Sequence, residues 1–391
     1  MEGAGELGIP RNSDYNGVLQ EGISYVQRTT YGRRRVSTAR AFLNPAKKRS
    51  NLKVLTNAFV TRILLDNKTA HGVEFSKGGR GGRPSKVLAK KEVILSGGTI
   101  NSPQLLQLSG IGPGALLRSL GVDVVHELAG VGENLRDHYA PRFCGRVKGI
   151  ETINEQSKGA KILGEIAKYF MGGKSILNLS PSMVYGFWHS DPVAKNNDIQ
   201  FVFAPASYKL GKHGLLADHP GFTVAAWQHR PDSKGWVRLR SADPFEKPII
   251  QPNYLSAESD RAVTIKAMKL ARSLMHTKSM RPYFDGEEYP GAEIESDDEL
   301  LDALEKVGLR GYEDSQCFTL SAGQQQRVSL SKLLLSRAKL WVLDEPFNHL
   351  DDLSIEILNQ TFIDHVNNNG MILFASHFDP IISNLETLEL N

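Results

Sequence analysis

Hydrophobic and polar positions in the first third of the chain form short apolar runs separated by turns. The runs at residues 52–55 and 60–65 predict two strands, and residues 91–95 predict a buried strand that enters a glycine pair at 97–98. Glycines between residues 78 and 84 predict the tip of a hairpin. The pattern indicates a domain built on sheets.

A helix is predicted directly after the glycine pair. Ser102 can cap its N-terminus, and Pro103 suits its first position because no needed N–H is lost there. Leucines between residues 105 and 108 would form its apolar face, and Gly110 would end it. Such a strand, glycine turn and helix let a cofactor's phosphate approach the backbone closely.

The middle of the chain has a different pattern. Residues 201–204 and 222–228 predict strands, and residues 235–239 alternate with period two, as a half-exposed antiparallel strand does. Residues 260–276 carry apolar side chains at helical spacing. This mixture predicts an α+β domain with an antiparallel sheet, of the kind that covers a substrate.

From about residue 302 the pattern becomes strand, helix, strand. Residues 340–343 and 371–375 are continuous apolar runs, which predict parallel strands buried on both faces. The predicted fold class is therefore α/β together with α+β. The predicted domains are residues 1–150, 151–301 and 302–391.

Composition and charge narrow the possible functions. Of the 391 residues, 40% are apolar and 23% charged, which is typical of a globular chain with two or three domains. Residues 301–391 contain six basic and thirteen acidic residues, a net of −7, and residues 1–300 contain 41 basic and 30 acidic residues, a net of +11. The basic residues are scattered without interleaved aromatic residues, so we expect two domains of different origin and no nucleic-acid partner.

The cellular location is also constrained. Two cysteines far apart form no metal spacing and no disulfide framework, which fits a reducing compartment. The first residues lack the basic and apolar regions of a signal peptide, and no apolar run approaches the roughly 20 residues of a membrane helix. We expect a cytoplasmic protein that is peripheral to the inner membrane only through a partner.

Chemistry-bearing residues gather in the last part of the chain. Ser321 and Gly323 precede a predicted helix whose N-terminus suits a phosphate. Asp344 and Glu345 end a predicted strand, where Asp344 could hold Mg²⁺ and Glu345 could polarise an attacking water. His377 follows the next strand and would reach the same edge. Taken singly, each of these residues also has an ordinary structural explanation.

Taken in order, these motifs resemble the ABC transporter ATPase family. Residues 320–325 correspond to its signature motif, 340–345 to Walker B, 348–351 to the D-loop and His377 to the switch histidine. The variant is most similar to the haem-exporter type of cytochrome c maturation.

The resemblance implies an ATP site shared with a partner ABC ATPase or membrane subunit. In it, Ser321, Gly323 and Gln324 would contact ATP held by the partner, Asp344 would bind Mg²⁺, and Glu345 and His377 would be catalytic.

The phosphate loop of the ABC transporter ATPase family has no counterpart in this sequence. The loop requires Gly-x4-Gly-Lys-Ser/Thr after a strand. The nearest match is at residues 172–175, but Lys168 stands where the first glycine should be, and residues 162–170 predict a helix. We interpret residues 172–175 as a loop of the middle domain.

The string from residue 98 to residue 112 matches the second signature of the glucose–methanol–choline (GMC) oxidoreductases. Further agreement lies in four other stretches, at residues 32–40, 51–56, 130–138 and 230–254. The resemblance spans residues 1–301 and is closest to choline- or alcohol-dehydrogenase-like members. It implies a partial doubly wound FAD-binding domain at residues 1–150 and an antiparallel-sheet substrate domain at 151–301; the other resemblance implies that residues 302–391 form the distal half of a P-loop-type ABC ATPase domain.

Members of that family oxidise an alcohol by hydride transfer to FAD. The resemblance implies that Val60 meets the adenine side of FAD, that Gly97 and Gly98 form the turn beside the dinucleotide, and that Asn134 lies near the flavin. Each has an ordinary alternative: strand core for Val60, turn formation for the glycines and a polar turn for Asn134. A small alcohol would be the substrate.

Two parts of that family's apparatus have no counterpart in this sequence. These are the Gly-x-Gly-x-x-Gly turn that holds the FAD pyrophosphate and the closing catalytic histidine, because His126, His138 and His229 stand in other contexts. Three hypotheses follow: an FAD-dependent alcohol oxidoreductase, an ATP-hydrolysing transporter subunit, or a fusion of two partial families without catalysis of its own. For activity we favour the third.

Overall fold

The computed structural model describes the chain as two compact units. Residues 1–32, 34–180, 182–193, 196–209, 214–300, 339–344, 346–347, 352–368 and 370–375 are described. The first unit comprises Met1–Val26, Tyr139–His229 and Arg261–Asn391, and the second comprises Gln27–His138 and Arg230–Asp260. Both are assembled from separate segments of sequence, whereas the sequence pattern predicts three consecutive domains. That division stays a prediction.

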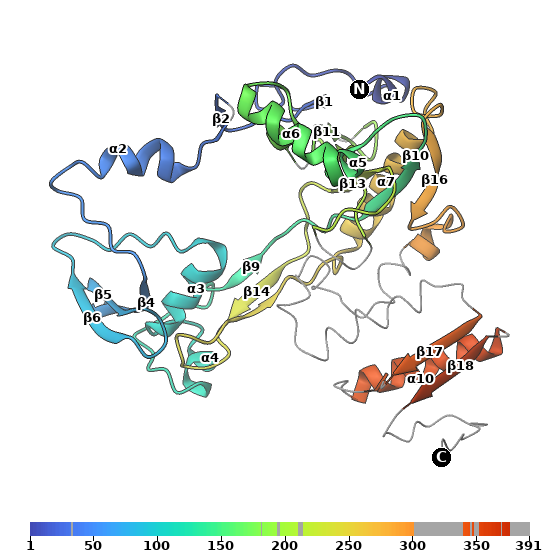
Figure 1. The fold of residues 1–391 in the computed structure, drawn as a ribbon. Coiled ribbons are helices and arrows are strands. Elements are labelled where there is room, and N and C mark those ends of the chain that lie inside the picture. Colours follow the sequence, from blue (N-terminus) through green and yellow to red (C-terminus); the bar gives the residue numbers. More distant parts are fainter. Residues whose placement is uncertain are drawn as a thin grey trace, which may run out of the picture. The chain divides into compact units, whose positions relative to one another are not determined.

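A six-stranded antiparallel sheet forms the centre of the first unit (Figure 1). Its strands, in the order in which they lie side by side, are β1 (Gly22–Tyr25), β11 (Val184–Trp188), β12 (Ile199–Ala204), β13 (Gly221–Gln228), β10 (Arg142–Val147) and β16 (Phe284–Tyr289). All eight residues of β13 are buried, as expected of a central strand. The predicted strands at 201–204 and 222–228 and the antiparallel sheet are confirmed.

Five described helices of this unit precede its C-terminal segments. They are α1 (Glu2–Glu6), α5 (Ile153–Gln156), α6 (Gly159–Met171), the 3₁₀ helix η2 (Ile176–Asn178) and α7 (Glu258–Met275). The helix predicted at residues 260–276 is α7, and the helix predicted at 162–170 is α6. Helix α7 buries Ala267, Met268, Ala271 and Met275, whose spacing makes one helix face.

The second unit contains smaller sheets. Its antiparallel sheets are β4 (Ala58–Asp66), β5 (Thr69–Lys77) and β6 (Arg83–Leu88); β15 (Ile249–Gln251), β14 (Gly235–Arg238) and β9 (Glu133–Leu135); and β2 (Thr30–Tyr31) with β3 (Arg34–Arg35). Its parallel pair is β7 (Ile111–Gly112) with β8 (His126–Glu127), and its helices are η1 (Ala39–Leu43), α2 (Asn44–Ala46), α3 (Gly98–Leu108) and α4 (Gly114–Ser119). The strands predicted at 60–65 and 235–239 and the hairpin tip at 78–84 are confirmed.

Two predicted strands of this unit, at residues 52–55 and 91–95, are wrong. Neither segment joins a ladder in the described part of the chain, and Ile94 is 78% exposed. A strand needs a neighbour for its backbone N–H and C=O groups, and an apolar run does not supply one. A doubly wound parallel sheet was expected in this unit. Among its described residues, the parallel strands are limited to the pair β7 and β8.

Helix α3 also differs from its prediction. It begins at Gly98 with Gly97 as N-cap, so that Pro103 lies inside the helix. Its buried side chains are Gln104 and Gln107, whereas the leucines of the expected apolar face are only half-buried. The reason is that α3 faces backbone carbonyl groups, which require donors that leucine lacks.

The C-terminal described segments form a small layer of their own. Strands β17 (Leu340–Asp344) and β18 (Met371–Ala375) are parallel, as predicted, and α10 (Asp352–Asn367) packs on one face through Phe362 and Leu358. The expectation of burial on both faces is wrong, because Met371 and Leu373 are exposed on the other face. None of the helices in the described parts of the chain is long and apolar enough to cross a bilayer.

Candidate functional site

The N-terminus of α3 is open to a ligand. Gly98 has a φ of 79°, and no atom lies within 4 Å of the position that a Cβ would occupy. Both Gly97 and Gly98 are exposed, and no side chain caps the helix. The free N–H groups and the positive end of the helix dipole can therefore receive an anionic oxygen, such as one from a dinucleotide.

Gln107 connects α3 to two distant parts of this unit. Its Nε2 donates to Val131 O (3.2 Å) and to Val237 O (3.0 Å), and its Oε1 accepts from Leu239 N (2.9 Å). The side chain is fully buried. Gln107 thereby satisfies three backbone groups that would otherwise be buried without partners.

Asn134 lies on β9 directly after this connection. It is exposed and has a φ of 61°, a conformation that asparagine adopts more readily than most residues. Its neighbour Glu133 is held by Arg238, whose Nη2 lies 2.9 Å from Glu133 Oε1. Gly132 has a φ of 86°, and a Cβ there would lie 2.1 Å from Val237 O. These contacts fix the backbone that carries Asn134.

Two stretches of sequence that resemble the GMC family, 130–138 and 230–254, meet in this unit. The hydroxyl of Tyr254 donates to Asp137, and Arg136 Nη1 lies 3.7 Å from Asp232 Oδ1. The sequence pattern did not predict the roles of Tyr254 and Gln107. The only sequence signal for Gln107 was a polar residue placed among leucines.

Val60 lies on β4, opposite Phe75 and beside an irregularity in the ladder. Its side chain is exposed, so burial in a strand core does not explain it. The structure places Val60, Gly97, Gly98 and Asn134 in the same unit. Their roles toward FAD stay predictions.

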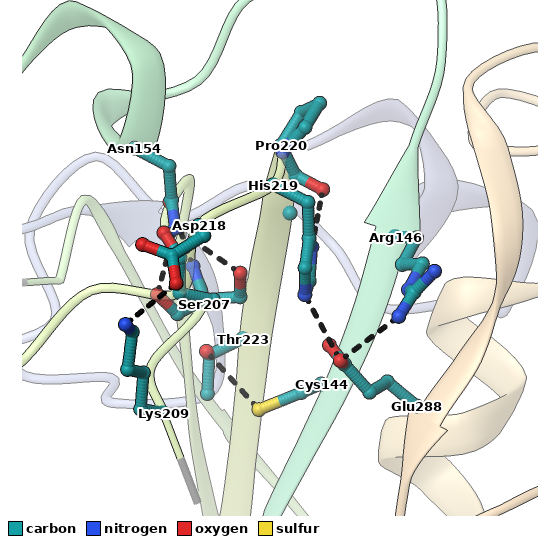
Figure 2. A network of polar contacts seen from close by, with 12 residues as sticks. Cys144, Arg146, Asn154, Ser207, Lys209, Asp218, His219, Pro220, Thr223 and Glu288 are labelled. Carbon is teal, nitrogen blue, oxygen red and sulfur yellow. Dashed lines mark hydrogen bonds and ion pairs between the residues drawn. The ribbon is translucent and has the colours of Figure 1, made fainter. Parts of the chain in front are cut away.

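A separate polar network lies at one end of the six-stranded sheet (Figure 2). Buried Asn154 donates from Nδ2 to Ser207 O (2.9 Å) and Ala217 O (3.0 Å). Lys209 Nζ lies 2.6 Å from Asp218 Oδ2. These bonds hold the connection between β12 and β13, so the network has a structural role.

Cys144 and His219 are the residues of this network whose side chains are of a kind often used as a nucleophile or a base. Burial raises the pKa of the Cys144 thiol, whose Sγ lies 3.6 Å from Thr223 Oγ1. A thiol that stays protonated is a poor nucleophile. His219 Nε2 lies 2.9 Å from Glu288 Oε1, which also approaches Arg146 Nη2 at 3.4 Å. The carboxylate of Glu288 therefore joins β16 to its neighbours, and we assign no catalysis to this network.

Most of the predicted ATPase residues lie outside the described residues. These are Ser321, Gly323, Gln324, Glu345 and His377. Asp344 ends β17 next to Ala375 at the end of β18, so two parallel strands finish at the same edge. No group of three or more metal-ligand side chains occurs within the described ranges. Magnesium binding by Asp344 stays a prediction.

Comparison with known proteins gives two family matches. The model of the GMC oxidoreductase family matches residues 1–140, and the model of the ABC transporter family matches residues 229–348. The second match begins before residue 302, in a region that relatives of the GMC type also cover. It includes Ser321 and Asp344 and ends before His377.

Choline dehydrogenases are among the curated relatives. The chain is 38% identical to the mitochondrial choline dehydrogenase of Homo sapiens, over 77% of the chain and 50% of the relative. It is 36% identical to the oxygen-dependent choline dehydrogenase of Staphylococcus xylosus, over 78% of the chain and 53% of the relative. The chain thus spans about half the length of the curated relatives it matches.

Solved structures show the same fold. Pyridoxine 4-oxidase from Mesorbium loti aligns with a TM-score of 0.65 at 24% identity, over 77% of this chain and 54% of that one. A formate oxidase aligns with a TM-score of 0.69 at 22% identity, over 77% of this chain and 56% of that one. At these identities the likeness concerns the fold alone.

Proposed function

We propose that this chain, which is of the GMC oxidoreductase type over most of its length, forms the sheet and the flavin-side turns of an FAD-dependent oxidoreductase for CH–OH groups. The observation that carries the proposal is the 38% identity to a choline dehydrogenase over 77% of the chain. The open N-terminus of α3 supports it, since a helix start with free N–H groups fits an anionic cofactor.

Four residues of the second unit would hold the cofactor. Gly97 and Gly98 would form the turn beside the dinucleotide, with open space at Gly98, while Asn134 would lie toward the flavin and Val60 toward the adenine. FAD, when bound, supplies the hydride acceptor. By the names of its relatives, the substrate would be a small alcohol of the choline class.

We further propose that the chain does not turn over an alcohol by itself. Its sequence contains neither the Gly-x-Gly-x-x-Gly turn for the pyrophosphate nor a histidine in the catalytic context. A catalytic centre needs its base and its cofactor site held together. The purified chain should show no flavin absorbance and no choline oxidation with a dye acceptor. Stoichiometric FAD in the purified chain would contradict this proposal.

Added FAD allows a sharper test of the α3 turn. If FAD binds weakly on titration, followed by flavin fluorescence, Gly98→Val should remove the binding because a side chain would fill the space beside the turn. Gly121→Val is the matched control, since Gly121 also has a positive φ and open space around its Cβ position. Equal loss in both variants would show that the α3 turn is not the site.

A second candidate function is ATP binding with a partner subunit. The ABC transporter match over residues 229–348 and the parallel β17–β18 pair favour it. We propose that Ser321, Gly323 and Gln324 would act on ATP held by an intact ATPase, whose type would be the haem exporter that these motifs resemble. The chain alone should hydrolyse no ATP. Turnover that Glu345→Gln abolishes would overturn that expectation.

A further inference from the structure

Two apolar segments of the second unit have open backbone groups. Residues 52–55 lead into β4, and residues 91–95 lead into Gly97 and α3. Within the part of the chain that the structure describes, residues 53–55 and 91–95 form no backbone–backbone hydrogen bond. Ile94 is 78% exposed and Leu55 is 50% exposed. Both segments therefore present free N–H and C=O groups next to exposed apolar side chains.

Helix α3 links the elements that follow these two segments. Its residue Ser109 accepts a hydrogen bond at Oγ from Ile63 N on β4 (2.8 Å), so that α3 lies beside β4 (Figure 1). The leucines of α3 between residues 105 and 108 are only half-buried. The apolar side of this helix is therefore covered only in part by the described chain.

The relatives indicate what covers these elements. Both open segments lie within residues 1–140, which the GMC oxidoreductase model matches. The chain spans 53% of the choline dehydrogenase of Staphylococcus xylosus and 54% of the pyridoxine 4-oxidase that shares its fold. In each of these proteins, a further part of comparable length accompanies the half that this chain resembles.

We propose, on the basis of the GMC function proposed above, that residues 52–55 and 91–95 form a docking edge for the remaining half of a GMC oxidoreductase, supplied as a separate polypeptide. That polypeptide would add strands to the docking edge through main-chain hydrogen bonds, and its apolar side chains would cover Ile94 and Leu55. Strand addition to open backbone is a general mode of recognition. Residues 91–95 directly precede Gly97 and Gly98, so docking would complete the surroundings of the turn proposed for the cofactor.

The chemistry of the docking edge argues against two other occupants. The interior of a bilayer cannot satisfy open backbone N–H and C=O groups, whereas a polypeptide strand can. The second unit contains 24 basic and 12 acidic residues, a net of +12. Two copies of the chain joined through this unit would bring like charges together.

Coexpression followed by hydrogen exchange tests the proposal. The full chain is produced together with polypeptides made from the parts of the Staphylococcus xylosus choline dehydrogenase that lie outside the alignment, and a complex should be recovered by gel filtration. In the chain alone, the amides of residues 53–55 and 91–95 should exchange fast. In the complex, their exchange should slow at least about tenfold, because ladder hydrogen bonds protect amides.

A pair of matched variants tests the apolar contact. Ile94→Lys should lower the affinity for the added polypeptides at least about tenfold, because an apolar contact would be replaced by a charge that has to leave water. Val193→Lys is the control, since Val193 is 83% exposed and lies outside the second unit; it should leave the affinity unchanged. Circular dichroism should show the same fold for both variants, because both replaced side chains are exposed.

Three outcomes would overturn the proposal. They are the absence of a complex with polypeptides from both the Staphylococcus xylosus and the Homo sapiens relatives, a complex in which the docking edge gains no protection, and protection of that edge in a dimer of the chain alone. The test also separates this proposal from the function on which it rests. A protected complex that binds no FAD would contradict the proposed function only, and FAD binding without protection would contradict the docking edge only.

Discussion

At the residue scale, the backbone of the second unit depends on close approaches that leave no room for ordinary side chains. Gly132 occupies a left-handed conformation between Val131 and Glu133, with the carbonyl of Val237 directly beside it. Gln107 reaches the same carbonyl from α3. The position of Asn134, and with it any contact to a flavin, follows from these two residues.

The first prediction concerns Gly132. Gly132→Ala should lower the free energy of unfolding by about 2–4 kcal/mol, because the φ is unfavourable and the new Cβ would lie 2.1 Å from Val237 O. Gly130→Ala is the control, since no atom lies within 4 Å of its Cβ position. Urea denaturation measures both; similar midpoints for the two variants would refute the close approach.

The second prediction concerns Gln107. Gln107→Leu keeps the volume but leaves two carbonyl groups and one N–H without partners, which should cost about 2–4 kcal/mol of unfolding free energy. Asn101→Leu, at an exposed position of the same helix, should have little effect. A stabilised Gln107→Leu variant would show that the carbonyl groups find other partners.

At the element scale, α7 and β16 are joined by a buried ion pair. Arg272 Nη2 and Nε lie 2.8 and 3.0 Å from the two oxygens of Glu287, and Arg272 Nη1 donates to Ile294 O (2.7 Å). The guanidinium also lies 5.3 Å from the ring centre of Phe143 on β10. One side chain therefore connects a helix, two strands and the segment after β16.

The third prediction follows from this pair. The side chain of Glu287 is 1% exposed, so Arg272→Met would leave a buried carboxylate unpaired and should cost about 3–5 kcal/mol in thermal or urea unfolding. The pair Lys148–Asp285 is exposed on both sides, so Lys148→Met should cost less than about 1 kcal/mol. Adding Glu287→Gln to Arg272→Met should recover part of the loss. If it does not, the pair itself is not the cause.

At the scale of the whole first unit, the N-terminal segment is part of the fold. Residues of β1 pair with β11 at the edge of the six-stranded sheet, and Glu6 at the end of α1 accepts from Lys278 N (2.7 Å) and Ser279 N (2.9 Å). Segments separated by most of the chain thereby meet. Hydrogen bonds from Ser279, of which the bond from its side chain has the largest effect, hold the pKa of Glu6 below its ordinary value.

The fourth prediction is a pH dependence of this contact. A lowered pKa in the folded chain adds stability above the unfolded pKa of about 4.3, and the contribution is lost as the pH falls through the folded value. The urea midpoint of Glu6→Gln should therefore lie below that of the wild type at neutral pH and meet it in acid. Glu2→Gln, in the first turn of the same helix, is the control. A difference that persists in acid would assign the effect to packing instead of charge.

Periodicity and motifs by themselves determined much of this protein. The alternation at residues 235–239, the helical spacing at 260–276 and the glycine hairpin tip at 78–84 predicted elements that the structure contains, because side-chain period and turn chemistry are local properties. The string from 98 to 112 likewise pointed to the GMC oxidoreductase family, which the relatives support over most of the chain.

Only the tertiary structure decided which partners these elements pack against and which groups they hydrogen-bond to. The run at residues 91–95 forms no strand because no described neighbour supplies a ladder, and Gln107 is buried because distant carbonyl groups face it. On α6, Leu163 and Phe170 are exposed whereas Glu165 is buried, with its carboxylate accepting a hydrogen bond from Ile176 N in the loop that follows. Burial and hydrogen bonding depend on partners distant in sequence, and a local pattern cannot name them.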